Sequence, residues 1–364
     1  MTRKQERTSR PGGSSPRTTL LVLGMHRSGT SAVAGALSHL GFAPPRPGDL
    51  MEHRPDNPRG HFESRSLSEL DEAVLARLGG SWERPPALAE GFELDAALDD
   101  LAAAAPGVLD RAFLPTDSKV IWKDPRLSLV LPLWRLVLPA PLLAVLVLRD
   151  PLEVALSLAA RNDLPLVKSV ALWERYMRQA VRSVRGMPVL VVDYPAVTAD
   201  AAGLAKGLDE LLVGAGVEPE PGGLAAAGAF LDPDLRHERR EDALQLAGSL
   251  LLPGQLELYE QLSAMAGAHG SFDAGDIGVE SPWTTALLGL DQDLEHTFDG
   301  LMWAVGQLRP LLDIEPIETG RSEEFIRYGR RGPELSVDDA DAAEPAPDSP
   351  YPLNASEDRR AYHR

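Results

Sequence analysis

The chain of 364 residues contains no cysteine, and this absence excludes several kinds of site. Without thiols the protein has no disulfide scaffold, no thiolate metal centre and no cysteine nucleophile. Aromatic residues are also scarce, at 5% of the chain, so Leu, Val and Ala must fill most of the core. With 44% hydrophobic residues, the chain is still long enough to bury a sizeable core in one large domain.

Positive charge is in short supply as well. The 36 Lys and Arg residues are outnumbered by 54 Asp and Glu, which gives a formal net charge of −18. Binding to nucleic acid or to an anionic membrane surface requires a field of Lys and Arg, so neither partner is expected. Any anionic ligand must be held by a few well-placed cations on an otherwise repulsive surface.

Long hydrophobic runs are missing too. The longest strongly apolar stretch, Leu138–Leu148, has 11 residues and includes two prolines, which is too short to span a bilayer. The basic N-terminal segment lacks the apolar region and cleavage site of a signal peptide. These observations predict a cytoplasmic protein without a transmembrane segment.

Polar, turn-rich composition marks both ends of the chain. Residues 1–17 form a basic tail and residues 331–364 an acidic, Pro-rich tail, and both are expected to be disordered. Between them we expect one domain over 18–265 and a helical extension over 266–330. The last helical pattern, 286–312, could pack on the core or on a second subunit, so a homodimer stays open.

Four short apolar runs predict a parallel sheet. Each run is apolar almost throughout rather than alternating, as expected for strands that are covered on both faces. Helical patterns separate the runs, and this alternation predicts a three-layer α/β/α fold with a central parallel sheet. The runs are Thr19–Leu23, Lys119–Lys123, Leu142–Arg149 and Pro188–Asp193. The helical patterns are Ser31–Leu40, Ser66–Leu78, Leu152–Ala160, Val170–Val184, Ala201–Leu212 and Asp242–Met265, and a loop is expected near 267–282.

A glycine-rich segment joins the first strand to the first helix. Gly24 and Gly29 keep the spacing of the Walker A loop, in which backbone N–H groups converge on an anion at a helix N-terminus. The Lys that clamps the outer phosphates of ATP is replaced by Thr30, which argues against a kinase or ATPase. Arg27 supplies a cation from inside the loop instead, and His26 is interpreted as a structural histidine. The plainer alternative is a turn that opens a helix and binds nothing.

Cations also follow the second and third apolar runs. Lys123 ends one run just before Asp124 and Pro125, and Arg149 ends the next, with Ser157 eight residues later. Open α/β sheets bind ligands at the carboxyl ends of their strands. A guanidinium there can bind phosphate oxygens bidentately, and a hydroxyl can donate one more hydrogen bond. The alternative is that these are surface charges at strand ends, with a serine that has no role.

Together, these motifs resemble those of sulfotransferases that use 3′-phosphoadenosine 5′-phosphosulfate (PAPS). The resemblance is closest to bacterial-type members, and the Lys-Asp-Pro segment also resembles that of tyrosylprotein sulfotransferases. It covers roughly residues 18–265 and rests on the loop, the Lys and the Arg/Ser pair, which occur in family order. It implies a sulfotransferase fold of the P-loop-containing nucleotide hydrolase kind. It also implies PAPS as the donor, no metal, and in-line transfer of a sulfuryl group to a hydroxyl or amine acceptor.

The resemblance also implies roles for individual residues. Arg27 would hold the phosphosulfate, Lys123 would reach the oxygen that bridges phosphate and sulfate, and both would act in catalysis. Arg149 and Ser157 would bind the 3′-phosphate, and a tyrosine after the fourth run would lie near the nucleotide. The residues implied to bind the donor are Arg27, Ser28, Gly29, Thr30, Ser31, Arg149, Ser157 and Tyr194.

The acceptor side is less defined. The loop over 41–63 is Pro-rich and polar, and such a loop is where acceptor contacts and a catalytic base are expected. Its last residues resemble an element of bacterial sulfotransferases, which favours Glu63 as the base. Glu52, His53 and His61 are the alternatives, and Glu63 could instead serve only the dipole of the next helix. The acceptor could be a small-molecule phenol, a glycan, a lipid headgroup or a peptide tyrosine.

Two rival functions remain open. A P-loop nucleotide kinase or hydrolase would need the missing loop Lys. A non-catalytic nucleotide-binding module of the same fold would not need to keep Arg27, Lys123, Arg149 and Ser157 together. The chain also departs from cytosolic aryl sulfotransferases, which carry Lys before Ser-Gly-Thr, a catalytic His and a C-terminal Arg-Lys-Gly segment. This departure bears on the acceptor and the base more than on the donor.

Overall fold

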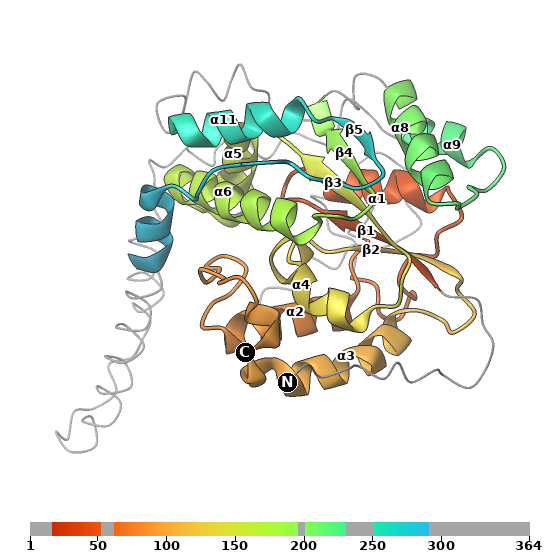
Figure 1. Ribbon diagram of the computed structural model, residues 1–364, viewed down its shortest axis with the longest axis horizontal. Coiled ribbons are helices and arrows are strands. Elements are labelled where there is room, and N and C mark those ends of the chain that lie inside the picture. Colours follow the sequence, from red (N-terminus) through yellow and green to blue (C-terminus); the bar gives the residue numbers. More distant parts are fainter. Residues whose placement is uncertain (1–16, 52–61, 196–200, 231–250, 291–364) are drawn as a thin grey trace, which may run out of the picture. The chain divides into compact units, whose positions relative to one another are not determined.

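The computed structural model describes residues 17–51, 62–195, 201–230 and 251–290, which form an α/β fold (Figure 1). Within these residues, five strands make one sheet in the order β2-β1-β3-β4-β5. The first four strands are parallel, and β5 runs antiparallel to β4. The strands are β1 Thr18–Leu23, β2 Lys119–Lys123, β3 Leu142–Leu148, β4 Val189–Asp193 and β5 Gly267–His269. The four strands expected from the sequence are confirmed to within one residue at each end.

Helices cover both faces of this sheet, as Figure 1 shows. The helices are α1 Thr30–Ser38, α2 Arg65–Arg77, α3 Asp99–Ala112, α4 Leu127–Val137, α5 Pro151–Asn162, α6 Leu166–Ser183, α8 Ala201–Gly214, α9 Gly223–Phe230 and α11 Pro253–Ser263. Two 3₁₀ turns, Phe92–Leu94 and Ala96–Leu98, precede α3, and residues 282–290 are helical.

Alternate side chains of each strand enter two separate cores. In β1, Leu21 and Leu23 pack with side chains of α2, α4 and α6 on one face of the sheet. Leu20 and Val22 pack with side chains of α1, α8 and α9 on the other face. All four are fully buried, and burial of one such side chain is worth roughly 1.5–3 kcal/mol. Burial on both faces explains why the strands are apolar throughout, and the three-layer α/β/α prediction is confirmed.

Several elements were not expected from the sequence, among them the two 3₁₀ turns and helices α3, α4 and α9. Helix α4 buries seven of its 11 residues and contains Pro132, a residue that is disfavoured inside helices. Helix α3 is Ala-rich and also contains a proline, Pro106. Strand β5 is only half-buried and lies where a loop was expected, because backbone pairing with β4 creates it. The sheet is therefore mixed at one edge rather than wholly parallel.

The order of the strands determines where a ligand is expected. Strand β1 pairs with β2 on one side and with β3 on the other, so the direction of winding reverses at β1. Ligands of open α/β sheets bind at such a switch point, beyond the carboxyl ends of the strands. The register aligns Val22 with Lys123 and Leu148 with Asp193. The phosphate loop, Lys123, Arg149 and Tyr194 therefore all follow strands at this one edge.

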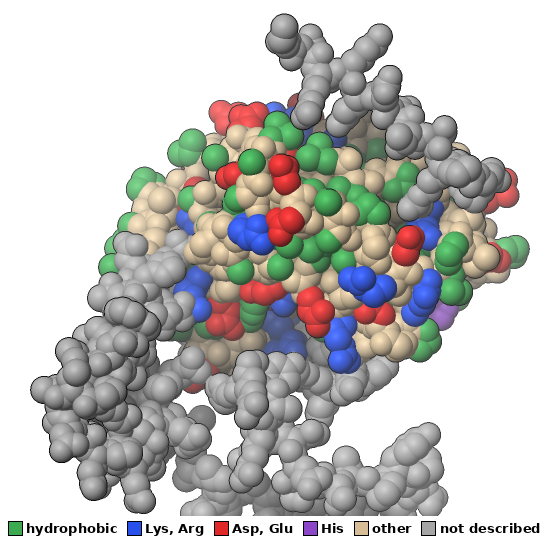
Figure 2. Space-filling view, turned by 90° about the horizontal axis from the view of Figure 1, so that it is seen from below, with side chains coloured by type: hydrophobic (Ala, Val, Ile, Leu, Met, Phe, Trp, Pro, Cys, Tyr) green, Lys and Arg blue, Asp and Glu red, His purple; other side chains and the backbone are tan. Residues whose placement is uncertain are grey.

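The surface and the chain ends add three observations. On the face shown in Figure 2, basic and acidic side chains are interspersed rather than gathered in separate fields. Among the described residues, none of the helices combines the length and the apolar character needed to cross a membrane.

Arg17, assigned above to the basic tail, donates hydrogen bonds to the carbonyls of Asp117 (3.2 Å) and Leu114 (2.7 Å). The remaining residues of both tails lie outside the described part of the chain, so the domain boundaries stay predictions.

Candidate functional site

Two glycines shape the phosphate loop because the neighbouring atoms leave no room for a side chain. A Cβ atom on Gly24 would lie 2.6 Å from the carbonyl oxygen of Val147 in β3. A Cβ atom on Gly29 would lie 2.4 Å from the ring of Tyr194, and Gly29 has a φ of 86°. Ser128 of α4 accepts a hydrogen bond from the N–H of Gly24 (2.9 Å) and donates one to its carbonyl (3.2 Å). Ser128, which the sequence did not single out, thus holds the loop from behind.

The end of the loop presents polar groups suited to an anion. Arg27 adopts a left-handed backbone conformation with φ of 67°, which is uncommon for a residue other than glycine. Helix α1 begins directly afterwards at Thr30, and no side chain caps its N-terminus. Ser28 is fully buried, and its Oγ has no hydrogen-bond partner among the described residues. An anion placed here would pair with groups that are otherwise unsatisfied.

Direct contacts bring together the residues implied to bind the donor. The Nε of Arg27 donates to Ser157 Oγ of α5 (3.0 Å), and Nη1 of Arg149 donates to the carbonyl oxygen of Arg27 (2.9 Å). The Arg149 guanidinium also lies over the Tyr194 ring, 5.9 Å from its centre, and this ring covers Gly29. Loop, β3, α5 and the residue after β4 therefore meet at one place.

A buried glutamate completes this group. Glu153 of α5 pairs with Arg149 through Oε2 and Nε at 2.9 Å, and the two side chains are 0% and 7% exposed. The carbonyl of Arg149 accepts a hydrogen bond from Trp173 of α6 (3.0 Å). Asp150 caps α5 by accepting from the N–H of Leu152 (2.9 Å). Sequence reasoning missed Glu153, although its position four residues after Arg149 at a helix start was a usable signal.

Lys123 and Glu63 form a buried ion pair through Nζ and Oε1, with the side chains 3% and 10% exposed. The N-terminus of α2 is served by other residues. Ser64 accepts from the N–H of Leu67 (3.1 Å), and Asp49 accepts from the N–H of Ser66 (3.1 Å). The Glu63 carboxylate therefore faces the lysine rather than the helix end. The alternative bases Glu52, His53 and His61 lie outside the described residues.

Residues just after Lys123 fasten α2 to the sheet. Asp124 accepts a hydrogen bond from Ser68 and pairs with Arg126 (3.1 Å), and Arg126 pairs in turn with Glu72 (2.8 Å). Behind them, the fully buried Asp71 accepts a hydrogen bond from Trp134 Nε1 (2.6 Å). Burial raises the pKa of Asp71 well above its usual range, and the nearby charge of Asp124 raises it further. Asp71 is therefore protonated over a wider pH range than an exposed aspartate.

His26 of the loop lies among aromatic rings and cations. Its imidazole packs 4.3 Å from the ring of Trp82 and meets Tyr176 edge-on at 5.8 Å. Its Nε2 is buried and has no hydrogen-bond partner in the part of the chain that the structure describes. Burial lowers the pKa of His26 well below its usual range, and four positive side chains lower it further. These are Arg126, Lys123, Arg161 and Arg27.

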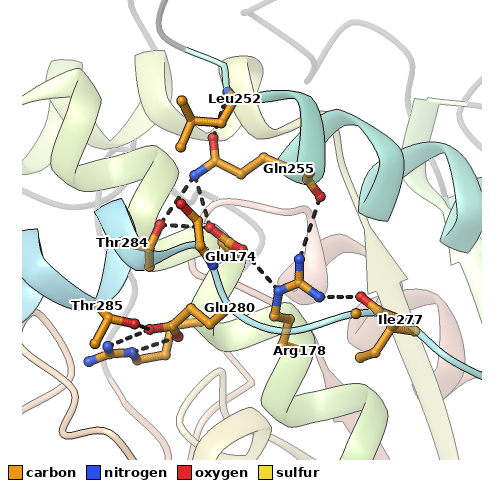
Figure 3. Close-up of polar contacts among 12 residues, drawn as sticks. Glu174, Arg178, Leu252, Gln255, Ile277, Glu280, Thr284 and Thr285 are labelled. Carbon is orange, nitrogen blue, oxygen red and sulfur yellow. Dashed lines mark hydrogen bonds and ion pairs between the residues drawn. The ribbon is translucent and has the colours of Figure 1, made fainter.

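A buried polar network in α6 holds the segment that packs over His26. Tyr176 donates to the carbonyl of Trp82 (2.9 Å), and Arg175 donates to the carbonyl of Pro85 (2.6 Å). Arg175 also pairs twice with Glu280, at 2.9 and 2.6 Å. In the same network, Glu174 accepts hydrogen bonds from Arg178, Gln255, Ser281 and Thr284, which join α6 to α11 and to the segment around 277–285 (Figure 3).

A cavity of about 610 Å³ lies elsewhere, where α4 and α6 end. It is lined by residues 88–93 and 275–278 together with Arg135 and Gln179, and by none of the residues implied to bind the donor. Since α4 starts at the carboxyl end of β2, its last turns lie toward the opposite edge of the sheet. The residues implied to bind the donor therefore lie at the carboxyl edge of the sheet and not in this cavity.

Comparisons with known proteins add the following. No family model and no curated protein matches this chain. Among solved structures, the chain is similar to the sulfotransferase domain from the Synechococcus PCC 7002 olefin synthase, at 16% identity and a TM-score of 0.37, over 71% of this chain and 98% of that one. It is also similar to the sulfotransferase domain from the curacin biosynthetic pathway, at 13% identity and a TM-score of 0.38, over 69% and 98% of the two chains. Both are sulfotransferase domains, the family that the sequence motifs resemble.

Proposed function

We propose that this chain is an enzyme that transfers a sulfuryl group from PAPS to a hydroxyl or amine acceptor. The observation that carries the proposal is the contact set of Arg27, Ser157 and Arg149. These residues come from three different parts of the fold, yet Arg27 of the glycine-rich loop contacts Ser157 at 3.0 Å and Arg149 at 2.9 Å. Two guanidinium groups at one loop are suited to a ligand with two separate phosphates, as in the donor nucleotide.

The loop and the third strand would hold different ends of the donor. The phosphosulfate would lie at the N-terminus of α1, where the buried Ser28 hydroxyl has no partner among the described residues and Arg27 adds positive charge. The 3′-phosphate would lie at Arg149 and Ser157. The ion pair with Glu153 supports this role, because it fixes the orientation of the guanidinium at the end of β3. The Tyr194 ring, packed on Gly29, would form a wall for the nucleotide.

Glu63 and Lys123 would carry the chemistry of transfer. The Glu63 carboxylate, paired with the Lys123 ammonium group, would accept the proton of the acceptor hydroxyl. Once Glu63 is protonated, the charge of Lys123 is no longer compensated by it. That charge can then stabilise the negative charge that develops on the departing phosphate as the acceptor oxygen bonds to sulfur. Lys123 is 3% exposed, so water screens this interaction little.

The acceptor and the cellular location complete the proposal. The acceptor belongs to one of four classes: a small-molecule phenol, a glycan, a lipid headgroup or a peptide tyrosine. We place the enzyme in the cytoplasm. Disulfides are rare in that compartment, and a chain without cysteine is compatible with it.

Nucleotide binding and label transfer test this function. In calorimetry, 3′,5′-bisphosphoadenosine should bind well and ATP with Mg²⁺ poorly. At a ligand concentration of about 100 times Kd, the nucleotide should add roughly 2.7 kcal/mol to the stability. Incubation with sulfur-labelled PAPS and a cell extract should give a labelled product, which mass spectrometry then identifies. An unchanged melting temperature with millimolar 3′,5′-bisphosphoadenosine would rule out the donor assignment.

A further inference from the structure

The phosphate loop holds two buried polar atoms that are not hydrogen-bonded to the described residues. They are Nε2 of His26 and Oγ of Ser28, on either side of Arg27. Buried polar atoms in native proteins nearly always have a partner, so an unpaired one needs an explanation. Two such atoms in one loop point to a ligand that this loop holds. The proposed contact of Ser28 with the phosphosulfate accounts for its Oγ atom. The Nε2 atom of His26 still needs a partner.

The charges around His26 indicate what kind of ligand its nitrogen would meet. Arg27, Lys123, Arg126 and Arg161 all act electrostatically on the imidazole, and they follow three different strands. Lys123 is paired with Glu63, and Arg126 with Asp124 and Glu72. Arg27, whose Nε donates to the neutral Ser157 hydroxyl, and Arg161 add positive charge near the imidazole, which favours an anion there. A neutral imidazole still carries one N–H group, so it can donate a hydrogen bond to an anionic oxygen without a further positive charge. Because Lys123 and Arg27 are both among these cations, His26 lies near both groups of the site.

The Trp82 ring packs on the imidazole of His26. The backbone of Trp82 is held on both sides, because its N–H donates to Glu72 (3.1 Å) and its carbonyl accepts from Tyr176 (2.9 Å). The indole ring itself makes no hydrogen bond within the described residues, and it packs on the imidazole at 4.3 Å. The indole therefore packs on the imidazole ring, whereas a hydrogen bond from Nε2 would form at the edge of the imidazole.

We propose that Nε2 of His26 donates a hydrogen bond to the sulfuryl group of the donor and so distinguishes PAPS from the product nucleotide. The proposal rests on the function proposed above and adds a contact to the one group that substrate and product do not share. His26 then binds the sulfuryl group that is transferred. The sequence analysis interpreted it as a structural histidine instead.

Three substitutions of His26 separate this role from packing. Gln places an amide N–H near the position of Nε2, Asn places one near that of Nδ1, and Leu offers none. We expect His26→Leu and His26→Asn to bind PAPS about 10- to 100-fold more weakly than the wild type, the usual loss for a hydrogen bond to a charged group. His26→Gln should stay within about threefold. All three should bind 3′,5′-bisphosphoadenosine like the wild type, as measured by calorimetry.

Each of the other outcomes of this experiment shows which part of the proposal is wrong. If the wild type binds neither nucleotide, the proposed function fails, whatever His26 does. If His26→Leu loses both affinities equally, or loses neither, the contact with the sulfuryl group does not exist. If every variant keeps its PAPS affinity but Gln and Leu both abolish turnover, His26 is a proton acceptor and the proposal is overturned. Should the Leu variant fail to fold, the comparison of Asn with Gln decides between these outcomes by itself.

Discussion

Buried cations at the carboxyl edge of the sheet each touch a carboxylate. Lys123 pairs with Glu63, and Arg149 pairs with Glu153. A charge taken out of water needs such a partner, since an unpaired buried ion costs several kcal/mol. This is how an acidic chain can keep cations in place for an anionic ligand. It also means that a substitution of one partner affects stability as well as function, and the two effects must be measured separately.

Removal of the Arg149 guanidinium tests the reading of the 3′-phosphate. Arg149→Ala should weaken binding of 3′,5′-bisphosphoadenosine by about 1.5–3 kcal/mol, the usual loss of a charge-assisted bond. Binding of AMP, which lacks the 3′-phosphate, should change less, so the variant should discriminate poorly between the two. Calorimetry measures both affinities, and Arg77→Ala, at an exposed ion pair with Asp100, is the matched control. An equal loss for both nucleotides would show that Arg149 does not recognise the 3′-phosphate.

The Lys123–Glu63 pair allows stability and turnover to be separated. Lys123→Met leaves the Glu63 carboxylate buried without its partner, so the free energy of unfolding should fall by about 3–5 kcal/mol. The second substitution, Glu63→Gln, removes that charge and should restore much of the loss in urea unfolding. Turnover should stay low in the double variant, and Glu63→Gln alone should lower it by roughly 10²–10⁴. Nucleotide affinity should change little throughout.

Two results would contradict these roles. Near-wild-type turnover in Glu63→Gln would place the base elsewhere, with His61, His53 and Glu52 next. If Lys123→Met lost nucleotide affinity in proportion to turnover, the lysine would act in ground-state binding and not in the transition state.

Among the elements, the loop depends on close packing between parts that are distant in the sequence. Strand β3 leaves no room for a side chain at Gly24, and the residue after β4 leaves none at Gly29. Ser128, at the start of α4, supplies hydrogen bonds to both backbone groups of Gly24. The loop is therefore rigid because three other elements enclose it. A ligand at α1 would meet groups that are already in position, which lowers the entropic cost of binding.

A matched pair of glycines tests this enclosure. Gly29 and Gly79 have φ values of 86° and 85°, but only Gly29 would place a Cβ against another side chain. Gly79→Ala should cost about 1–2 kcal/mol, the penalty for a left-handed alanine. Gly29→Ala should cost clearly more in urea unfolding, because its Cβ would lie 2.4 Å from the Tyr194 ring. Tyr194→Ala in the same chain should recover the difference, and equal losses for the two glycines would show that Tyr194 does not confine the loop.

In the molecule as a whole, Asp71 links stability to pH. Its pKa is raised by burial, so the folded protein keeps a proton that the unfolded chain releases above about pH 4. The contribution of Asp71 to stability should therefore be fully present at or below that pH and be lost as the pH rises toward its folded-state pKa. Asp71→Asn can still accept from Trp134 and carries no charge, so its unfolding free energy should depend less on pH. Urea titrations between about pH 4 and 8 measure this, and identical slopes for both proteins would contradict it.

Much of the fold could be predicted because it depends on local patterns. Runs such as Lys119–Lys123 are apolar on both faces, and Gly24 and Gly29 keep a fixed spacing between a strand and a helix. Helix α4 and strand β5 were not predicted, because the local sequence at these two places does not favour them. The helix is almost wholly apolar and contains Pro132, and the strand is three residues long and depends on its pairing with β4.

The sequence alone determined the strands, the loop and the order of Arg27, Lys123 and Arg149 along the chain, since each depends on neighbouring residues. Only the tertiary structure decided which charges meet. It paired Glu63 with Lys123 across 60 residues, set Arg27 against Ser157 across 130, and left Nε2 of His26 buried without a partner among the described residues. These relations follow from the packing of distant strands and helices, because burial makes a charge or a polar atom depend on whatever group the fold brings next to it.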